Sequence, residues 1–238
     1  MTSAPPGLTD TGPVPHQRPT ALPDGAQETM NAYSPMPEPL HLLGVIASPR
    51  TESTSARMVD AVLTQAVLHG AESRLLDLRH DPLPFFAGED AHPAPEVRGL
   101  LAAALWADAF VLGTPDYHGG PSGILKNLLD HLWRQLGGKL VAVVVSSNEK
   151  GLTVQDQVRT AVRQCYGWSL PYGVGATPEE VGNSGEIANP RIRTRLTMMA
   201  RDLVVYGRLI RDQRLADSAA PPNPAEAGFM ARIRPQQP

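Results

Sequence analysis

The stretch that decides the fold runs from residue 113 to residue 130 and reads Gly113-Thr114-Pro115-Asp116-Tyr117-His118-Gly119-Gly120-Pro121-Ser122-Gly123-Ile124-Leu125-Lys126-Asn127-Leu128-Leu129-Asp130. It follows a short apolar run, passes through a turn rich in glycine and proline, and enters an amphipathic pattern. A strand, a loop and a helix in this order place backbone N–H groups and flat side chains at the carboxyl end of a parallel strand. In open α/β sheets, ligands bind at that end.

Outward from this stretch, apolar runs alternate with helical patterns along the chain. The apolar runs predict strands at Leu42–Ala47, Ser73–Leu78, Ala109–Gly113, Leu140–Val145 and Ser169–Val174. The helical patterns predict helices at Ser55–His69, Pro95–Ala107, Ser122–Leu136, Thr153–Tyr166 and Arg191–Arg211. This alternation is typical of a three-layer α/β sandwich with a parallel sheet.

Right-handed crossovers and five strands at this spacing favour a doubly wound, flavodoxin-like sheet with strand order 2-1-3-4-5. Its ligand crevice lies between the loops that follow the first and third strands. We therefore expect the loop from Ser48 to Ser55 and the loop from Thr114 to Gly120 to lie side by side.

Composition narrows the class of protein. The chain has 238 residues, of which 42% are hydrophobic and 19% charged, and a net charge of −3. This balance gives no general attraction to nucleic acid or to an anionic membrane, and no apolar run approaches the roughly 20 residues of a membrane helix. The single cysteine, Cys165, allows no intrachain disulfide and no multi-cysteine metal cluster. These features favour a cytoplasmic protein.

Both ends of the chain differ from its middle. Residues 1–39 are crowded with Pro, Gly, Thr and Ser without periodicity, and 216–238 contain a similar Pro-rich run. Such compositions do not bury enough apolar surface to fold alone. We therefore predict disordered tails at 1–39 and 216–238 and one folded domain at 40–215.

The first loop has the residue types that bind a mononucleotide phosphate. Hydroxyls, a cation with two parallel donors and the start of a helix come together here, in Ser48, Arg50, Ser53, Thr54 and Ser55. No glycine-rich dinucleotide pattern follows the first strand, which disfavours a Rossmann NAD site. The alternative is that Ser53 or Ser55 only caps the helix and that Arg50 is solvated.

The second loop suits a planar ligand such as an isoalloxazine ring, because small residues let the backbone approach it and aromatic side chains shape the pocket. Its candidate residues are Thr114, Pro115, Asp116, Tyr117, His118 and Gly119. A third loop follows the fourth strand, where Ser147 and Asn148 could touch the pyrimidine edge of a flavin. The alternatives are an ordinary turn and a polar connection.

These loops resemble the NADPH-dependent FMN reductase family of flavodoxin-like proteins. The family's first loop reads roughly Gly-Ser-x-Arg-x-x-Ser-x-Asn/Ser, which this chain matches from Ser48 to Ser55 with Ala47 in place of the glycine. Its second signature, Thr/Ser-Pro-x-Tyr followed by Gly-x-Leu-Lys-Asn-x-x-Asp, matches 114–117 and 123–130. The resemblance implies that Lys126, Asn127 and Asp130 are structural, at the helix start and subunit interface.

The resemblance implies FMN as cofactor, NADPH or NADH as hydride donor, and a flavin, quinone or similar small-molecule acceptor, with a flavin-dependent monooxygenase as a possible partner. It also implies a homodimer or homotetramer. The cofactor carries the chemistry, so no catalytic acid or base is named. Two other functions stay open: a flavodoxin-like electron carrier, and an FMN-dependent dehydrogenase of one biosynthetic intermediate.

Overall fold

The computed structural model describes residues 38–88, 93–183 and 186–219. The predicted tail 1–39 lies outside the described residues except for Glu38 and Pro39. Along the chain, the elements are β1 (Leu40–Ile46), α1 (Thr54–Leu68), β2 (Ala71–Asp77), α2 (Pro95–Trp106), β3 (Ala109–Tyr117), β4 (Gly120–Pro121), α3 (Gly123–His131), a 3₁₀ turn (Arg134–Leu136), β5 (Leu140–Ser146), α4 (Leu152–Gln164), β6 (Trp168–Ser169), β7 (Val174–Ala176), α5 (Pro178–Val181) and α6 (Pro190–Ala219).

The sheet has the predicted flavodoxin-like order. Strands β2, β1, β3 and β5 lie side by side and are parallel, and β6 and β7 both pair in parallel with the far edge of β5. The predicted fifth strand, 169–174, is therefore two short strands with a break between them. Pro171 and Gly173 lie in that break, and both residue types weaken a strand.

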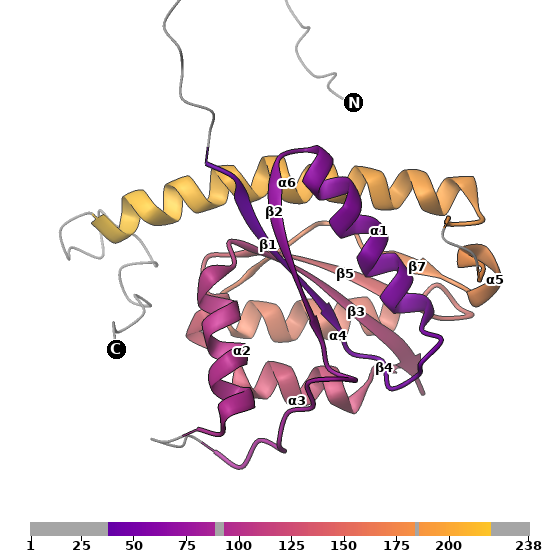
Figure 1. Cartoon of the computed structure of the whole chain (residues 1–238), viewed down its shortest axis with the longest axis horizontal. Coiled ribbons are helices and arrows are strands. Elements are labelled where there is room, and N and C mark those ends of the chain that lie inside the picture. Colours follow the sequence, from indigo (N-terminus) through magenta and orange to yellow (C-terminus); the bar gives the residue numbers. More distant parts are fainter. Residues whose placement is uncertain (1–37, 89–92, 184–185, 220–238) are drawn as a thin grey trace, which may run out of the picture. The chain divides into compact units, whose positions relative to one another are not determined.

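Helices cover both faces of the sheet and enclose two cores (Figure 1). One core packs α1 and α6 against residues such as Leu42, Val111 and Val144. The other packs α2, α3 and α4 against the alternate residues of the same strands, including Leu43 and Leu112. Burial on both faces explains why β1, β3 and β5 read as nearly continuous apolar runs. In the described part of the chain, no helix has the length and hydropathy that a membrane crossing requires.

One glycine allows the close packing of α1. A Cβ atom at Gly113 would lie 2.5 Å from Val59 Cγ2 and 3.1 Å from the Ser55 carbonyl oxygen. The absence of a side chain therefore lets the first turn of α1 approach the end of β3, and this brings the first and second loops together.

The structure corrects three predicted elements. β3 does not end at Gly113 but continues to Tyr117 and turns back as β4. The helix predicted to end at Leu136 stops at His131, because the buried Leu132 takes an extended backbone and leads into the 3₁₀ turn. The closing helix α6 has 30 residues and reaches Ala219, so 216–219 are helical rather than part of a tail. The rest of that predicted tail lies outside the described residues.

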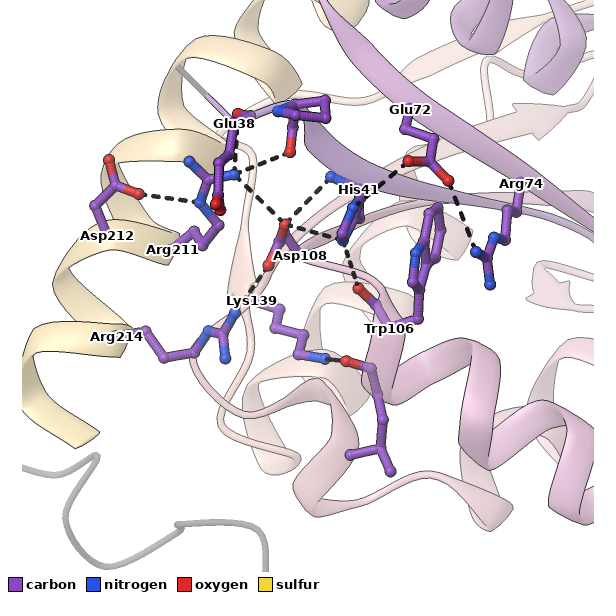
Figure 2. A network of polar contacts seen from close by, with 12 residues as sticks. Glu38, His41, Glu72, Arg74, Trp106, Asp108, Lys139, Arg211, Asp212 and Arg214 are labelled. Carbon is purple, nitrogen blue, oxygen red and sulfur yellow. Dashed lines mark hydrogen bonds and ion pairs between the residues drawn. The ribbon is translucent and has the colours of Figure 1, made fainter. Parts of the chain in front are cut away.

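A polar network ties the end of α6 to the amino ends of the strands (Figure 2). The Asp108 carboxylate, just before β3, accepts hydrogen bonds from Arg214 Nη2 at 2.9 Å and from the His41 backbone N–H at 3.2 Å, and lies 3.8 Å from Arg211 Nη1. Lys139, just before β5, donates from Nζ to the Ala104 carbonyl at 2.6 Å. These side chains are largely buried, and they pair with one another or with backbone carbonyls near the amino ends of the strands.

Candidate functional site

The loop between β1 and α1 is organised by its own serines. The side chain of Ser53 caps α1 by accepting a hydrogen bond from the Ala56 N–H at 3.1 Å, and its hydroxyl lies 3.1 Å from that of Ser55. Ser48 accepts a longer hydrogen bond from the Arg50 N–H, at 3.4 Å. The capping role considered for Ser53 is thus present, since a serine with this geometry satisfies one of the free N–H groups of the helix.

Several donors of this loop remain unused. The backbone N–H groups of Thr54 and Ser55, at the start of α1, donate no hydrogen bond within the described residues. The Arg50 guanidinium is exposed and has no partner in the same part of the chain. A helix start with free N–H groups beside an unpaired cation is suited to a phosphate.

A second arginine fixes the backbone of this loop. Arg79 Nη1 donates to the carbonyl oxygens of Arg50, at 3.2 Å, and of Thr51, at 2.8 Å. The rest of its guanidinium binds the Asp77 carboxylate, with Nε–Oδ1 at 2.9 Å and Nη2–Oδ2 at 2.5 Å. This pairing holds the pKa of Asp77 below its usual range. Arg79 is therefore held rigidly by the end of β2 and holds the loop in turn.

The second loop is a tight hairpin. β3 and β4 pair antiparallel through Asp116 with Pro121 and Tyr117 with Gly120. The turn between them consists of His118 and Gly119, whose φ angles are +57° and +78°. Two successive left-handed residues make the turn that suits the twist of a hairpin. Glycine takes this conformation freely, and histidine takes it more readily than most other residues.

Hydrogen bonds attach the hairpin to the third loop and to α4. The Asp116 carboxylate accepts from the Gly119 N–H and from the Ser147 hydroxyl, both at 2.9 Å. Ser147 also accepts from the Glu149 N–H at 3.1 Å. Gln157 on α4 donates to the Gly119 carbonyl at 2.8 Å. The turn is therefore fixed by residues from outside the hairpin.

Another serine joins the first loop to the second. Ser122, which caps α3, donates from its hydroxyl to the Ala47 carbonyl at 2.5 Å. Its N–H donates to the Thr114 hydroxyl at 3.0 Å. Thr114 is fully buried, so its side chain supports the hairpin from inside the fold.

All the predicted site residues lie at the carboxyl edge of the sheet, in the loops after β1 and β5, in the first turn of α1, and in the end of β3 with its turn to β4. Their side chains divide into two groups. One group already makes hydrogen bonds within the fold and consists of Ser48, Ser53, Ser55, Thr114, Asp116 and Ser147. The other makes none by its side chains in the described part of the chain, and consists of Arg50, Tyr117, His118 and Asn148. The second group is free to contact a ligand.

Sequence reasoning missed Arg79 and Gln157 and gave Ser122 no role in joining the loops. Their partners lie 28 to 75 positions away in the chain. The position of Ser122 just before a helix was visible as a cap signal, but its contact with Ala47 was not. Nothing in the local sequence around Arg79 or Gln157 distinguishes them from surface residues.

The residues singled out beside the loops are structural. Lys126 Nζ lies 2.6 Å from Asp130 Oδ1 across one turn of α3, and Asn127 accepts from the Phe86 N–H and donates to the Pro84 carbonyl. The Cys165 thiol donates weakly to the Leu132 carbonyl at 3.4 Å, and burial raises its pKa. A raised pKa disfavours the thiolate, so Cys165 does not have the environment of a nucleophile.

The donor set fits a flavin mononucleotide better than a dinucleotide pyrophosphate. The first loop offers one cation, hydroxyls and two free N–H groups over a short span, which match a terminal phosphate. The hairpin offers backbone and a half-buried Tyr117 side chain, which match a ring. The two are joined by hydrogen bonds, so they form one site.

Comparison with known proteins identifies relatives of this chain. A family model described as NADPH-dependent FMN reductase matches residues 40–181. The chain is similar to the NADPH-dependent FMN reductase ArsH of Shigella flexneri, with 25% identity over 192 residues that cover 77% of this chain and 74% of the relative. It is also similar to an FMN-dependent NADPH-azoreductase of Staphylococcus aureus, with 30% identity over 135 residues, 53% of this chain and 71% of the relative.

Solved structures share the fold. The flavoenzyme NAD(P)H:(acceptor) oxidoreductase FerB of Paracoccus denitrificans superposes with a TM-score of 0.61 at 17% identity, over 71% of this chain and 98% of that chain. An oxidoreductase of Corynebacterium diphtheriae superposes with a TM-score of 0.59 at 18% identity, over 74% and 98%.

Proposed function

Because the chain belongs to the NADPH-dependent FMN reductase family, we propose that the crevice at the carboxyl edge of its sheet holds FMN through the three loops described above. The chain is an NAD(P)H-dependent oxidoreductase with FMN and NADPH as its cofactors. The observation that supports this placement is the convergence of a phosphate-type loop and a rigid hairpin, joined through Ser122, with the third loop attached to the hairpin through Asp116.

In this placement the start of α1 would hold the phosphate of FMN through the free N–H groups of Thr54 and Ser55, and Arg50 would supply the positive charge. Tyr117, His118 and Gly119 of the hairpin would hold the ring, with Ser147 and Asn148 of the third loop beside it. Arg79 would support this loop by donating hydrogen bonds to the carbonyls of Arg50 and Thr51.

FMN held by these residues would supply the hydride-accepting and electron-transferring chemistry between NAD(P)H and an acceptor. The residues of the chain supply position and polar contacts. The hairpin would orient the ring, because Asp116 and Gln157 fix its turn. No side chain is needed to move a proton in the hydride transfer itself.

We propose a flavin, a quinone or a similar small molecule as the acceptor, with a flavin-dependent monooxygenase as a further partner when reduced flavin leaves as product. His118 is exposed at the turn and Gly119 has no atoms near its missing Cβ position. The outer side of the hairpin is therefore open, which suits a small acceptor that enters and leaves.

The test is aerobic NADPH oxidation by the purified protein with and without added FMN. We expect oxidation, and a rate that rises and saturates with added FMN means that FMN is a substrate. Turnover without added FMN means a prosthetic group, and quinones and azo compounds are then compared as acceptors. A protein that binds FMN but oxidises neither NADPH nor NADH would contradict the proposed reductase and favour the carrier or the dedicated dehydrogenase.

We further propose a cytoplasmic homodimer or homotetramer. Phe85 is 88% exposed and Trp133 is 49% exposed, and both lie beside α3. Large apolar side chains so exposed support an interface between subunits. Light scattering of the purified protein would measure the mass, and a monomer at all concentrations would contradict the proposal.

A further inference from the structure

A cavity of about 610 Å³ lies at the outer edge of the sheet beside β7. It opens between the start of α4, the short strand β7 and the start of α6. Its polar lining includes Lys150, Arg159, Glu180, Arg191 and Arg195. Four of these five groups are cationic, although the chain as a whole carries a net charge of −3. Cationic side chains are therefore concentrated around this cavity.

Two of the arginines have no carboxylate partner. Arg195 donates from Nη2 to the Gly173 carbonyl at 3.0 Å, and the Arg191 guanidinium makes no hydrogen bond or ion pair within the described residues. They stand four positions apart on α6 and so lie on one face of the helix. Arg193, between them, points elsewhere and lies 3.5 Å from Glu186.

The carboxylate in the lining is already neutralised. Both oxygens of Glu180 lie 2.8 Å from Lys150 Nζ, and they also accept from the Thr177 N–H at 3.0 Å and from Asn189 Nδ2 at 3.3 Å. Arg159 binds Asp156 at 3.1 Å, outside the lining. What the cavity presents to a ligand is therefore the charge of Arg191 and Arg195.

This cavity adjoins the crevice that we assign to FMN. Lys150 and Gly175 line the cavity, and the loop from β5 to α4 that contains Lys150 also contains Ser147 and Asn148. This loop lies directly on β7: a Cβ atom at Gly175 would overlap the Lys150 carbonyl oxygen at 1.9 Å, and the Ser147 N–H donates to the Ala176 carbonyl at 3.0 Å. One side of the loop between β5 and α4 faces the crevice, and Lys150 on the same loop lines the cavity.

We propose that Arg191 and Arg195 bind the 2′-phosphate of NADPH, which makes this cavity the subsite that distinguishes NADPH from NADH. The inference rests on the proposed function. A phosphate monoester carries close to two negative charges at neutral pH and matches the paired donors of a guanidinium. The start of α6, which faces the cavity through Asn189 and Arg191, adds the positive end of a helix dipole.

The binding test needs no turnover. Isothermal calorimetry compares adenosine 2′,5′-bisphosphate with adenosine 5′-monophosphate on the full chain, as wild type, as the double variant Arg191→Gln/Arg195→Gln and as the control Arg193→Gln. We expect the bisphosphate to bind wild type and the control at least tenfold more tightly than the monophosphate, and the double variant to lose this difference. Equal binding of the two ligands to wild type, or a difference that survives in the double variant, would overturn the proposal.

The kinetic test uses the ratio of kcat/KM for NADPH to that for NADH. The double variant should lower this ratio at least tenfold, and Arg193→Gln should leave it unchanged. An unchanged ratio in the double variant contradicts the subsite. Inorganic phosphate added to the calorimeter tests whether the arginines bind the phosphate group itself. If they do, phosphate abolishes the preference of wild type for the bisphosphate and has no effect on the double variant. Failure of wild type to oxidise either nucleotide would refute the reductase, while the calorimetric comparison would still decide this inference.

Discussion

The two ends of the sheet use polar residues in opposite ways. At the amino end, Asp108, Lys139, Arg211 and Arg214 are largely buried and engage one another or nearby carbonyls (Figure 2). At the carboxyl end, the serines and Asp116 also pair with the fold, but Arg50 and the first N–H groups of α1 do not.

This difference separates stability from binding. Charges that pair inside the fold stabilise it only as long as every partner is present. Donors that the fold leaves unpaired at an edge contribute little to folding and are available for a ligand. Substitutions at the two ends should therefore affect different measurements, and the following experiments test that separation in order of expected effect.

The largest effect should come from the amino end. Asp108→Asn removes the charge that faces Arg211 and Arg214 and leaves two largely buried cations without it. We expect the free energy of unfolding in urea to fall by about 3 kcal/mol, with the dissociation constant of FMN unchanged at temperatures where the variant is folded. A loss below about 1 kcal/mol, or a large change in FMN affinity, would contradict the separation of stability and binding between the two ends of the sheet.

At the carboxyl end, Arg50→Ala should weaken FMN binding by roughly 1.5–3 kcal/mol, because a charged hydrogen bond to the phosphate is lost. The free energy of unfolding without FMN should change by less than about 0.5 kcal/mol. Quenching of flavin fluorescence measures the first quantity and urea denaturation the second. Arg163→Gln, an exposed substitution on α4, is the control. Unchanged FMN affinity in Arg50→Ala would remove the first loop from the site.

The third test uses pH. Burial lowers the pKa of Lys139 to about 7, below the value near 10.4 of an unfolded lysine. Between these values the unfolded chain binds more protons than the native one, so stability rises with pH, by at most about 1.4 kcal/mol per pH unit. Below pH 7 Lys139 is protonated in both the folded and the unfolded chain, so its contribution to stability no longer changes with pH.

Urea denaturation from pH 7 to pH 9.5 should therefore show a rise for wild type that Lys139→Met lacks. A pH above 9.5 is avoided because burial and the contact with Asp202 raise the pKa of Tyr172 in the folded chain. Stability then falls as pH rises through the pKa of the same tyrosine in the unfolded chain. Parallel curves for wild type and Lys139→Met would show that Lys139 stays charged in the native state.

The smallest effect should come from a pair that belongs to neither end. Lys126 and Asp130 form an exposed i, i+4 pair on α3 with N–O at 2.6 Å. Lys126→Gln should cost about 0.3–0.5 kcal/mol of unfolding free energy and nothing in FMN affinity. Thermal unfolding monitored by circular dichroism would measure it, and a loss of several degrees or of FMN binding would show that the family motif does more than stabilise a helix.

The fold was predictable because its signals are local. Apolar runs of the right length at Leu42–Ala47 and Leu140–Val145 placed the central strands, and the structure confirms the flavodoxin-like order. The hairpin was harder. The sequence predicts a loop at Thr114–Tyr117 because of Pro115. In the structure β3 continues through these residues, and Pro115 pairs with Ser146 of β5.

The placement of the site at the carboxyl edge was predictable from topology alone, but its internal contacts were not. The sequence predicts Ser147 at a flavin, but it does not predict that the Ser147 hydroxyl donates to Asp116, 31 positions away. The contacts of Arg79 and of the amino-end network join segments that are far apart in the sequence. Arg214 also lies at the very end of the predicted domain, 40–215. Single-sequence patterns carry no information on such pairs.

The left-handed turn at His118 has a consequence for how this enzyme could diversify. Its φ of +57° admits Gly, Asn, Asp and His and penalises β-branched side chains. A saturation library at position 118 would therefore be filtered by backbone geometry before acceptor chemistry is selected. Asn148, exposed and outside the left-handed region, has no such filter. Natural or laboratory evolution of acceptor choice should draw on position 148 far more freely than on position 118.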